Sequence, residues 1–158
     1  MNNSDKQFMQ MAIELALDGM RKNEGGPFGA IVVKDKTVIG RGNNRVLYKN
    51  DPTAHAEIEA IREACQNVKS FHLEGCTLYT LCEPCPMCMA AVYWAKISKV
   101  VFGCTRKDAA KIGFADDSIY KELNMPPSER SIPMESMLRD DSLRVFDEWI
   151  KKHDKINY

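Results

Sequence analysis

The sequence has no excess of either charge and no hydrophobic run long enough to cross a membrane. Its 22 Lys and Arg residues balance 22 Asp and Glu residues. This balance indicates neither a strongly basic surface for nucleic acid nor an acidic tail. No apolar run approaches the roughly 20 residues that a transmembrane helix needs. We therefore expect no membrane partner, and the composition disfavours nucleic acid as a partner.

The sequence also lacks internal repeats and a recognisable linker. Its 158 residues, of which 44% are hydrophobic, predict a single globular domain over residues 1–158 with a substantial core. Residues 1–5 are polar, so we expect no secretory signal peptide and a cytoplasmic location. The six cysteines are then expected to be reduced thiols, because disulfides rarely persist in the cytoplasm.

Hydrophobic periodicity and turn residues predict an alternating order of helices and strands. A helix begins near Ser4 and ends before the Gly25-Gly26-Pro27 breaker. Strands are expected at residues 28–34, 37–42, 77–80, 99–103 and 131–137, and further helices at residues 53–66, 85–95, 116–123 and 140–152. The strand–helix–strand portion implies a parallel pair with a crossover, and hence an α/β sandwich.

Two short motifs supply candidate metal ligands. His55-Ala56-Glu57 is followed about thirty residues later by a Cys-x-x-Cys pair, Cys85 and Cys88. One imidazole and two thiolates give three protein ligands, which leave one position of a tetrahedral zinc ion open, as in catalytic zinc sites. We predict one Zn²⁺ per subunit, bound by His55, Cys85 and Cys88. Glu57 would carry protons beside a water in the open position.

A Cys-x-x-Cys pair alone is also typical of redox motifs and of half a structural zinc ribbon. A structural site needs a fourth ligand. The spare candidates are Cys65, Cys76, Cys82, Cys104, His72 and His153. Only Cys82 is close in sequence, and neither a redox pair nor a structural zinc site needs a carboxylate two residues from the histidine. The joint motif favours catalytic zinc, with a non-catalytic zinc module as the alternative.

Both motifs begin predicted helices. Cys85 and Cys88 are three residues apart and so share a helix face. His55 and Glu57 lie in the first turns of the preceding helix. Positive helix N-termini favour thiolates and stabilise negative charge that develops during a reaction. We expect the two helices to build one pocket.

The joint motif resembles the signature of zinc-dependent nucleobase deaminases. Residues 25–30 (Gly-Gly-Pro-Phe-Gly-Ala), 50–57 (Asn-Asp-Pro-Thr-Ala-His-Ala-Glu) and 82–88 (Cys-Glu-Pro-Cys-Pro-Met-Cys) together resemble the cytidine-deaminase-like superfamily. Within it, the chain is most similar to the short bacterial guanine deaminases, through the second and third segments and a C-terminal tyrosine. tRNA adenosine deaminases usually have Leu-Glu-Pro-Cys in the third segment.

The resemblance implies a three-layer α/β/α sandwich with a mixed five-stranded sheet, and a homodimer. It further implies that a C-terminal helix and tail, at about residues 140–158, are exchanged onto the partner subunit and help to close its active site. The predicted C-terminal helix has an apolar stripe formed by Leu143, Phe146, Trp149 and Ile150. Such a stripe must pack against its own domain or a neighbour.

The resemblance also implies a set of substrate contacts. It places Phe28 against the purine ring, Asn44 and Asp116 at polar edges of the base, the backbone of Ala56 near the reacting centre, Trp94 near the pocket, and Tyr158 in the partner's site. At two positions a neighbouring residue could take the role instead: Asn43 in place of Asn44, and Asp117 in place of Asp116. Structural roles are the alternatives: core packing for Phe28 and Trp94, a helix N-cap for Asp116 and a frayed end for Tyr158.

The activity implied by the resemblance is hydrolytic deamination of guanine to xanthine and ammonia, in purine catabolism or salvage. The alternatives are another small base or nucleoside, such as guanosine, cytosine or ammeline, and adenosine in tRNA. The balanced charge disfavours an RNA substrate. A tail that closes the pocket should exclude ribose, which favours the free base.

Overall fold

The computed structural model describes residues 3–157 and divides the chain into two compact units, Met1–Asp117 and Ser118–Tyr158. The elements are α1 (Asn3–Arg21), β1 (Gly29–Lys34), β2 (Thr37–Asn43), α2 (Val46–Lys49), α3 (Ala56–Val68), β3 (Thr77–Cys82), α4 (Pro86–Trp94), β4 (Lys99–Cys104), α5 (Arg106–Lys111), α6 (Asp117–Asn124), the 3₁₀ helix η1 (Pro127–Glu129) and α7 (Arg139–Lys151). Within residues 3–157, no helix has the length and apolarity needed to span a membrane.

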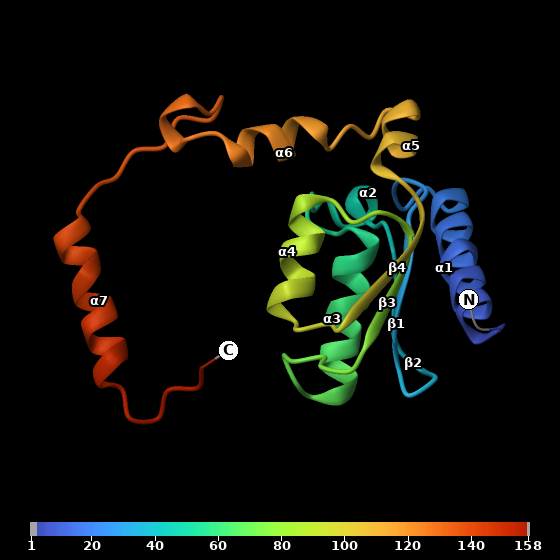
Figure 1. Ribbon diagram of the computed structural model, residues 1–158, viewed down its shortest axis with the longest axis horizontal. Helices are drawn as coiled ribbons and strands as arrows, with labels where there is room; N and C mark the ends of the chain where they lie inside the picture. The colour runs from blue at the N-terminus through green and yellow to red at the C-terminus, as the bar shows by residue number, and fades with distance from the viewer. Residues whose placement is uncertain (1–2, 158) are drawn as a thin grey trace. The chain divides into compact units, whose positions relative to one another are not determined.

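The first unit contains a mixed sheet with strand order β2-β1-β3-β4 (Figure 1). β1 pairs antiparallel with β2 and β3, and β3 pairs parallel with β4. The predicted α/β class is confirmed, but the predicted fifth strand is wrong, because residues 131–137 form no strand. Pro133 has no N–H to donate, and Ile132 is the only β-branched residue of that segment.

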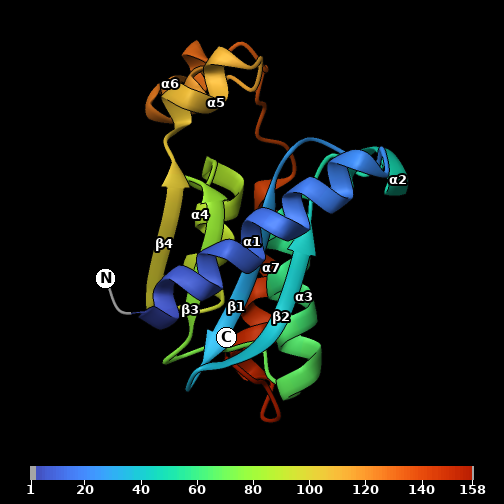
Figure 2. The same ribbon diagram turned by 90° about the vertical axis from the view of Figure 1, so that its right-hand side faces the viewer.

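Helices cover both faces of this sheet. Figure 2 shows α1 in front of the strands and α3 behind them. Side chains alternate between the two faces because the strand period is two residues. Ile31 and Tyr79 belong to the cluster that includes Phe8 of α1, whereas Val32 and Leu78 belong to the cluster beneath α3 and α4.

Glycines let the helices approach the sheet closely. A Cβ atom added at Gly42 would lie 2.2 Å from the carbonyl oxygen of Ala56, the first residue of α3. A Cβ added at Gly29 would lie equally close, 2.2 Å, to the carbonyl oxygen of Ala12 in α1. The first turn of α3 therefore lies directly against the end of β2, which fixes the height of that turn above the sheet.

Two short helices were not predicted. α2 has four residues and α5 has six, too few to show a helical period in the sequence. α5 is set by its ends: Thr105 and Asp108 form a capping box at its start, and Gly113, with φ of 94°, follows its end. Both helices follow strands of the sheet.

The second unit contains most of α6, η1 and α7. The Arg130 guanidinium donates to the backbone carbonyls of Glu122 and Met125, which fixes the turn after α6. No side chain among the described residues 118–157 is buried. The predicted apolar stripe of α7 is present, and Phe146 and Ile150 remain 65% and 67% exposed. A helix with such a stripe needs a surface that covers it.

Candidate active site

A cavity of about 430 Å³ lies at one end of the sheet in the first unit. It is bounded by the N-terminal ends of α3 and α4, the segments that flank β1 and β2, the end of β3 and the loop after α5. The lining residues are Gly25, Gly26, Phe28, Asn44, Val46, Leu47, Pro52, His55, Glu57, Cys82, Glu83, Cys85, Ala109, Phe114 and Asp116. The volume falls in the range of small-molecule sites, roughly 300–1,000 Å³.

Three metal-ligating side chains meet at this cavity. His55 and Cys85 are the N-cap residues of α3 and α4, and Cys88 lies one turn into α4. Nδ1 of His55 lies 3.6 Å from Sγ of Cys85 and 3.5 Å from Sγ of Cys88. Zn–S distances of about 2.3 Å and a Zn–N distance of about 2.0 Å in tetrahedral geometry would separate sulfur from nitrogen by about 3.5 Å. The donor spacing therefore fits one zinc ion.

The pKa values of the two thiols and of the imidazole depend on one another. The pKa of Cys85 is lowered to about 4, first because the Cys88 thiol donates a hydrogen bond to it and further because of His55. The same hydrogen bond, together with burial, raises the pKa of Cys88. The pKa of His55 is raised, chiefly by its hydrogen bond with Cys85. Two buried sulfurs can both be thiolates only with a cation between them, and nitrogen–sulfur donor sets of this kind suit zinc.

Glu57 is the second residue of α3, and its buried side chain lines the cavity. Burial raises the pKa of its carboxyl group to about 7, and Cys85, His55 and Cys88 are its electrostatic and hydrogen-bonding neighbours. The carboxyl group thus lies beside the three donors at the base of the cavity. A carboxyl group in this position can carry protons to and from a reacting molecule.

The orientation of the Asn44 side-chain amide is determined by its neighbours. Asn44 is only 6% exposed, and its Oδ1 accepts hydrogen bonds from the backbone N–H groups of Gly26, at 3.3 Å, and Val46, at 3.2 Å. Both partners are donors, so the oxygen must occupy that position. The Nδ2 group is left as the donor at the cavity, which Asn44 lines.

An aromatic pair and a carboxylate form another part of the wall. The rings of Phe28 and Phe114 are edge-to-face, with centroids 4.9 Å apart. Asp116, two residues after Phe114, also lines the cavity, and its pKa is raised chiefly by burial. Apolar and polar groups therefore meet at this wall, as is typical of small-molecule sites.

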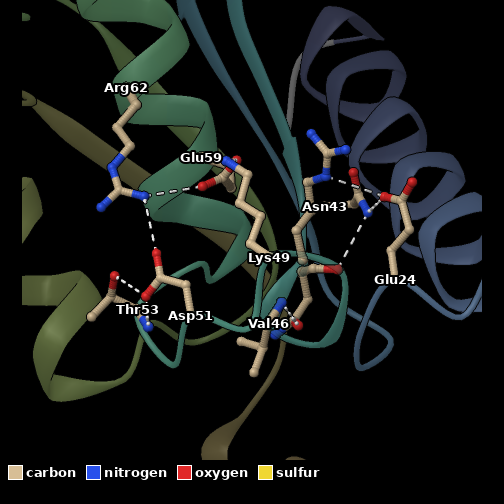
Figure 3. Close-up of polar contacts among 10 residues, drawn as sticks. Glu24, Asn43, Val46, Lys49, Asp51, Thr53, Glu59 and Arg62 are labelled. Carbon is tan, nitrogen blue, oxygen red and sulfur yellow. Dashed lines mark hydrogen bonds and ion pairs between the residues drawn. The ribbon is translucent and has the colours of Figure 1, made fainter.

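The rim beside α2 is held by Glu24 on one side (Figure 3). Asn43 Nδ2 donates to Oε2 of Glu24 at 2.7 Å, and Nε of Arg45 lies 3.4 Å from the same oxygen. The backbone carbonyl of Glu24 accepts from the N–H groups of Leu47 and Tyr48 in α2. The start of α2 is therefore tied to the turn after α1, and Leu47 is held at the cavity.

The other side of α2 is tied to α3 (Figure 3). Lys49 pairs with Glu59 at 2.5 Å, and Arg62 pairs with Glu59 at 3.1 Å. Arg62 also lies 3.9 Å from Asp51, in the loop between α2 and α3. These ion pairs are partly exposed and contribute little stability individually. Together with the Glu24 contacts, they fix the loop that precedes His55.

The cavity brings together many, but not all, of the predicted site residues. His55, Glu57, Cys85, Phe28, Asn44 and Asp116 line it, and Cys88 is buried beside them. Ala56 is buried and Trp94 is 67% exposed at the end of α4, and neither is among the lining residues of the described chain. Tyr158 lies outside the described residues. The predicted roles in substrate binding stay predictions.

The resemblance does not distinguish Asn43 from Asn44 or Asp116 from Asp117, but the structure gives the two members of each pair different surroundings. Asn44 lines the cavity, whereas the amide of Asn43 donates to Glu24. Asp116 lines the cavity, whereas Asp117 begins α6 and pairs with Arg106 at 3.8 Å. Position alone therefore favours Asn44 and Asp116 as the residues available to a ligand.

Sequence reasoning missed several lining residues, notably Leu47, Glu83 and Phe114. Leu47 lies in the unpredicted helix α2, and Phe114 follows the unpredicted helix α5. Glu83 lies between two motif residues, and it accepts a hydrogen bond from the backbone N–H of Arg106 at 3.1 Å. Its place in the Cys-Glu-Pro-Cys segment, and the nearness of Phe114 to Asp116 in sequence, were the available signals.

The chain is similar in sequence and in fold to known deaminases. Residues 2–104 match the family described as the cytidine and deoxycytidylate deaminase zinc-binding region. The chain is 45% identical over 151 residues to the guanine deaminase of Bacillus subtilis, covering 96% of this chain and 97% of that protein. The crystal structure of guanine deaminase from Bacillus subtilis superposes with a TM-score of 0.95 and 44% identity, covering 100% of this chain and 99% of the other.

A second group of relatives consists of proteins whose names describe an RNA substrate. The tRNA-specific adenosine deaminase of Buchnera aphidicola subsp. Schizaphis graminum is 42% identical over 113 residues. That match covers 72% of this chain and 74% of the relative.

We predict that purified protein contains about one zinc ion per chain and that Cys85→Ala loses most of it, because two ligands hold the ion poorly. Metal analysis after dialysis measures the content. Cys65→Ala removes a thiol outside the cavity and serves as the control. Full zinc content in Cys85→Ala would contradict the ligand assignment.

Proposed function

The chain belongs to the cytidine and deoxycytidylate deaminase family, and from that premise we propose that it hydrolyses guanine to xanthine and ammonia. The observation that carries the proposal is the base-sized cavity at which the three zinc donors lie next to the buried carboxyl group of Glu57. The likeness to a guanine deaminase over 96% of the chain supports guanine as the substrate. Purine catabolism or salvage is the matching cellular context.

His55, Cys85 and Cys88 would hold zinc, and the ion would supply the Lewis acidity that makes water a nucleophile near neutral pH. Glu57 accepts the proton of the attacking water and delivers it to a ring nitrogen beside C2 of guanine. Glu57 then takes the second proton of the same water, now the hydroxyl on C2, and passes it to the amino group. The C2–N bond breaks as the C2–O double bond forms, and ammonia leaves. One carboxyl group thus serves as general base and general acid.

Groups around Glu57 support the same reaction. Ala56 is the first residue of α3, so its backbone N–H has no carbonyl partner within the helix. We assign this N–H to the negative charge that develops at the reacting centre, together with the positive ends of α3 and α4. Phe28 supplies an apolar face for the base. Asn44 donates through Nδ2 to an acceptor of guanine, and Asp116 accepts from an N–H group of the ring.

The protein is proposed to act as a homodimer in which residues of about 140–158 of one subunit cover the cavity of the other. Two observations support this, each from one unit. The second unit has no buried side chain among residues 118–157, and its α7 stripe is uncovered. In the first unit, Phe102 of the edge strand β4 and Tyr93 and Trp94 of α4 are exposed. Trp94 would then approach substrate only in the dimer.

A cytoplasmic location is part of the proposal. Thiolate ligands at Cys85 and Cys88 must stay reduced to hold zinc, and the cytoplasm keeps thiols reduced. The substrate, a free purine base, is a small molecule that would meet the enzyme there.

Deamination of adenosine in tRNA is the second candidate, favoured by the 42% identity over 113 residues to a tRNA-specific enzyme. The balance of 22 basic and 22 acidic residues argues against it. Ammonia release from guanine, guanosine, cytosine, ammeline and a tRNA anticodon stem–loop separates the candidates. The proposal requires guanine to be the preferred substrate, and a preference for the stem–loop would replace it with the second candidate.

We predict that Glu57→Gln keeps its zinc and its fold but loses guanine turnover. An amide neither accepts nor delivers the proton, and general acid–base catalysis typically contributes about 10²–10⁴-fold, so the loss should reach the upper end of that range. Ammonia release from zinc-loaded protein measures it. Glu63→Gln, which changes another carboxylate of α3, is the control. Near-normal turnover of Glu57→Gln would exclude the proposed proton carrier.

Asn44→Asp should retain the fold, because the carboxylate can still accept from Gly26 and Val46, but it replaces the donor at the cavity by an acceptor. We predict a fall in kcat/KM for guanine of about 10²-fold or more, since a buried acceptor on the base is left facing another acceptor. Steady-state kinetics measure the change. Asn67→Asp alters an asparagine outside the cavity and should leave kcat/KM unchanged, and the same result for Asn44→Asp would remove Asn44 from the substrate site.

Removal of Asn157 and Tyr158 should leave zinc content and dimer mass intact while sharply reducing guanine turnover. It should also relax the exclusion of guanosine, because the segment that would clash with ribose is gone. Kinetics on both substrates, with Lys151→Ala as the control in the same tail, measure the effect. Unchanged guanine kinetics would leave the tail with a structural role only.

A further inference from the structure

We propose that Phe114 is a substrate-binding residue that forms, with Phe28, an aromatic corner for the base and sets how bulky a substrate the cavity accepts. The proposal rests on the proposed function, because it assigns a role at the same site. It adds a residue that neither motif contains, contributed by a loop distant in sequence from both.

The rings of Phe28 and Phe114 form the two sides of the corner. The two rings are perpendicular, at 90°, with centroids 4.9 Å apart, and both line the cavity. In such a pair the edge of one ring meets the face of the other. A flat base that lies on the face of one ring therefore meets the other ring at its rim. The ring on which the base lies limits it along the normal to its plane, and the perpendicular ring limits it within that plane.

The position of Phe114 is built into the fold. Its backbone N–H donates to the carbonyl of Ala109 at 3.0 Å, and Gly113 before it has φ of 94°, a conformation that glycine adopts easily. The start of the same helix, α5, is tied through the Arg106 N–H to Glu83, another lining residue. Contacts at both ends of α5 therefore direct Phe114 toward the cavity.

Gly26 provides a third contact of the corner. A Cβ atom added there would lie 2.8 Å from Cζ of Phe114 and 3.2 Å from Cε2 of Phe28. Only a residue without a side chain leaves both rings where they are. The loop of Gly26 thus fits closely against the tips of the rings.

Exposure indicates that the ring of Phe114 has a surface left for a ligand. The residue is 40% exposed although its ring packs against Phe28 and Gly26. Stacking of a nucleobase on an aromatic side chain is worth about 1–3 kcal/mol by alanine substitution, roughly 5- to 150-fold in affinity, and the contact of Phe114 with the edge of a base on Phe28 is expected at the lower end of that range. Contact of this kind is made equally in the ground state and the transition state, so its loss should raise KM more than it lowers kcat.

The test is steady-state kinetics of Phe114→Leu and Phe114→Ala on guanine and guanosine, together with zinc content and melting temperature. We expect KM for guanine to rise by roughly fivefold or more in Phe114→Ala, with a smaller rise in Phe114→Leu. The kcat should change by less than about threefold, and the ratio of guanosine to guanine turnover should increase. Phe71→Leu is the matched control, because Phe71 is 49% exposed and edge-on to His72 but does not line the cavity.

Gly26→Ala gives an independent test, because its methyl group would displace the Phe114 ring without removing it. The rise in KM caused by Gly26→Ala should be smaller in the Phe114→Leu background than in the wild type, since contacting residues are not additive. Unchanged KM in Phe114→Ala, or an equal change in Phe71→Leu, would overturn the proposal. A wild-type enzyme that deaminates another planar base but not guanine would overturn the proposed function instead, and KM for that base would then test Phe114.

Discussion

The 3.5–3.6 Å separation between Nδ1 of His55 and the two cysteine sulfurs requires α3 and α4 to begin side by side at one end of the sheet. That requirement also determines how several other elements are placed. β3 must pair with β4 in parallel so that α4 crosses over one face, and α3 must cover the same face. Gly42 permits the approach of α3, because a side chain there would collide with the carbonyl of Ala56. The polar contacts around α2 then hold the loop that delivers His55.

The same arrangement would let one small cavity combine the proposed hydrolytic chemistry with recognition of the base. The helix ends supply the metal donors and Glu57, while the segments flanking β1 and β2 supply Phe28 and Asn44. The amide of Asn44 is oriented by two backbone donors, so its nitrogen presents a fixed hydrogen bond to the cavity. In the proposed function, chemistry and recognition thus come from different elements, which would allow related proteins to share the first and differ in the second.

The sequence predicted those parts of the structure that depend on local spacing. The metal donors were found because a three-residue spacing on one helix and an adjacent His-x-Glu motif identify them without knowledge of the fold. The strands of the first unit and α3 and α4 were predicted from periodicity. The helices α2 and α5 are too short to show a period, so Leu47 and Phe114 were missed with them. The strand expected at residues 131–137 was wrong because apolar spacing alone does not form a strand around Pro133. Which loops reach the cavity depends on strand order, and no local pattern encodes that order.

The separation of the metal donors along the sequence affects how fast the metal site can form during folding. His55 and Cys88 are 33 residues apart, and β3 lies between them in the chain. Their meeting depends on non-local strand pairing, which is slow because loop closure costs entropy before any contact compensates for it. On a ribosome, α1, the β1–β2 hairpin and α3 emerge before either cysteine of the pair. The two thiols therefore meet His55 only after α4 has packed beside α3, so the metal site is completed late in folding, after these non-local contacts have formed.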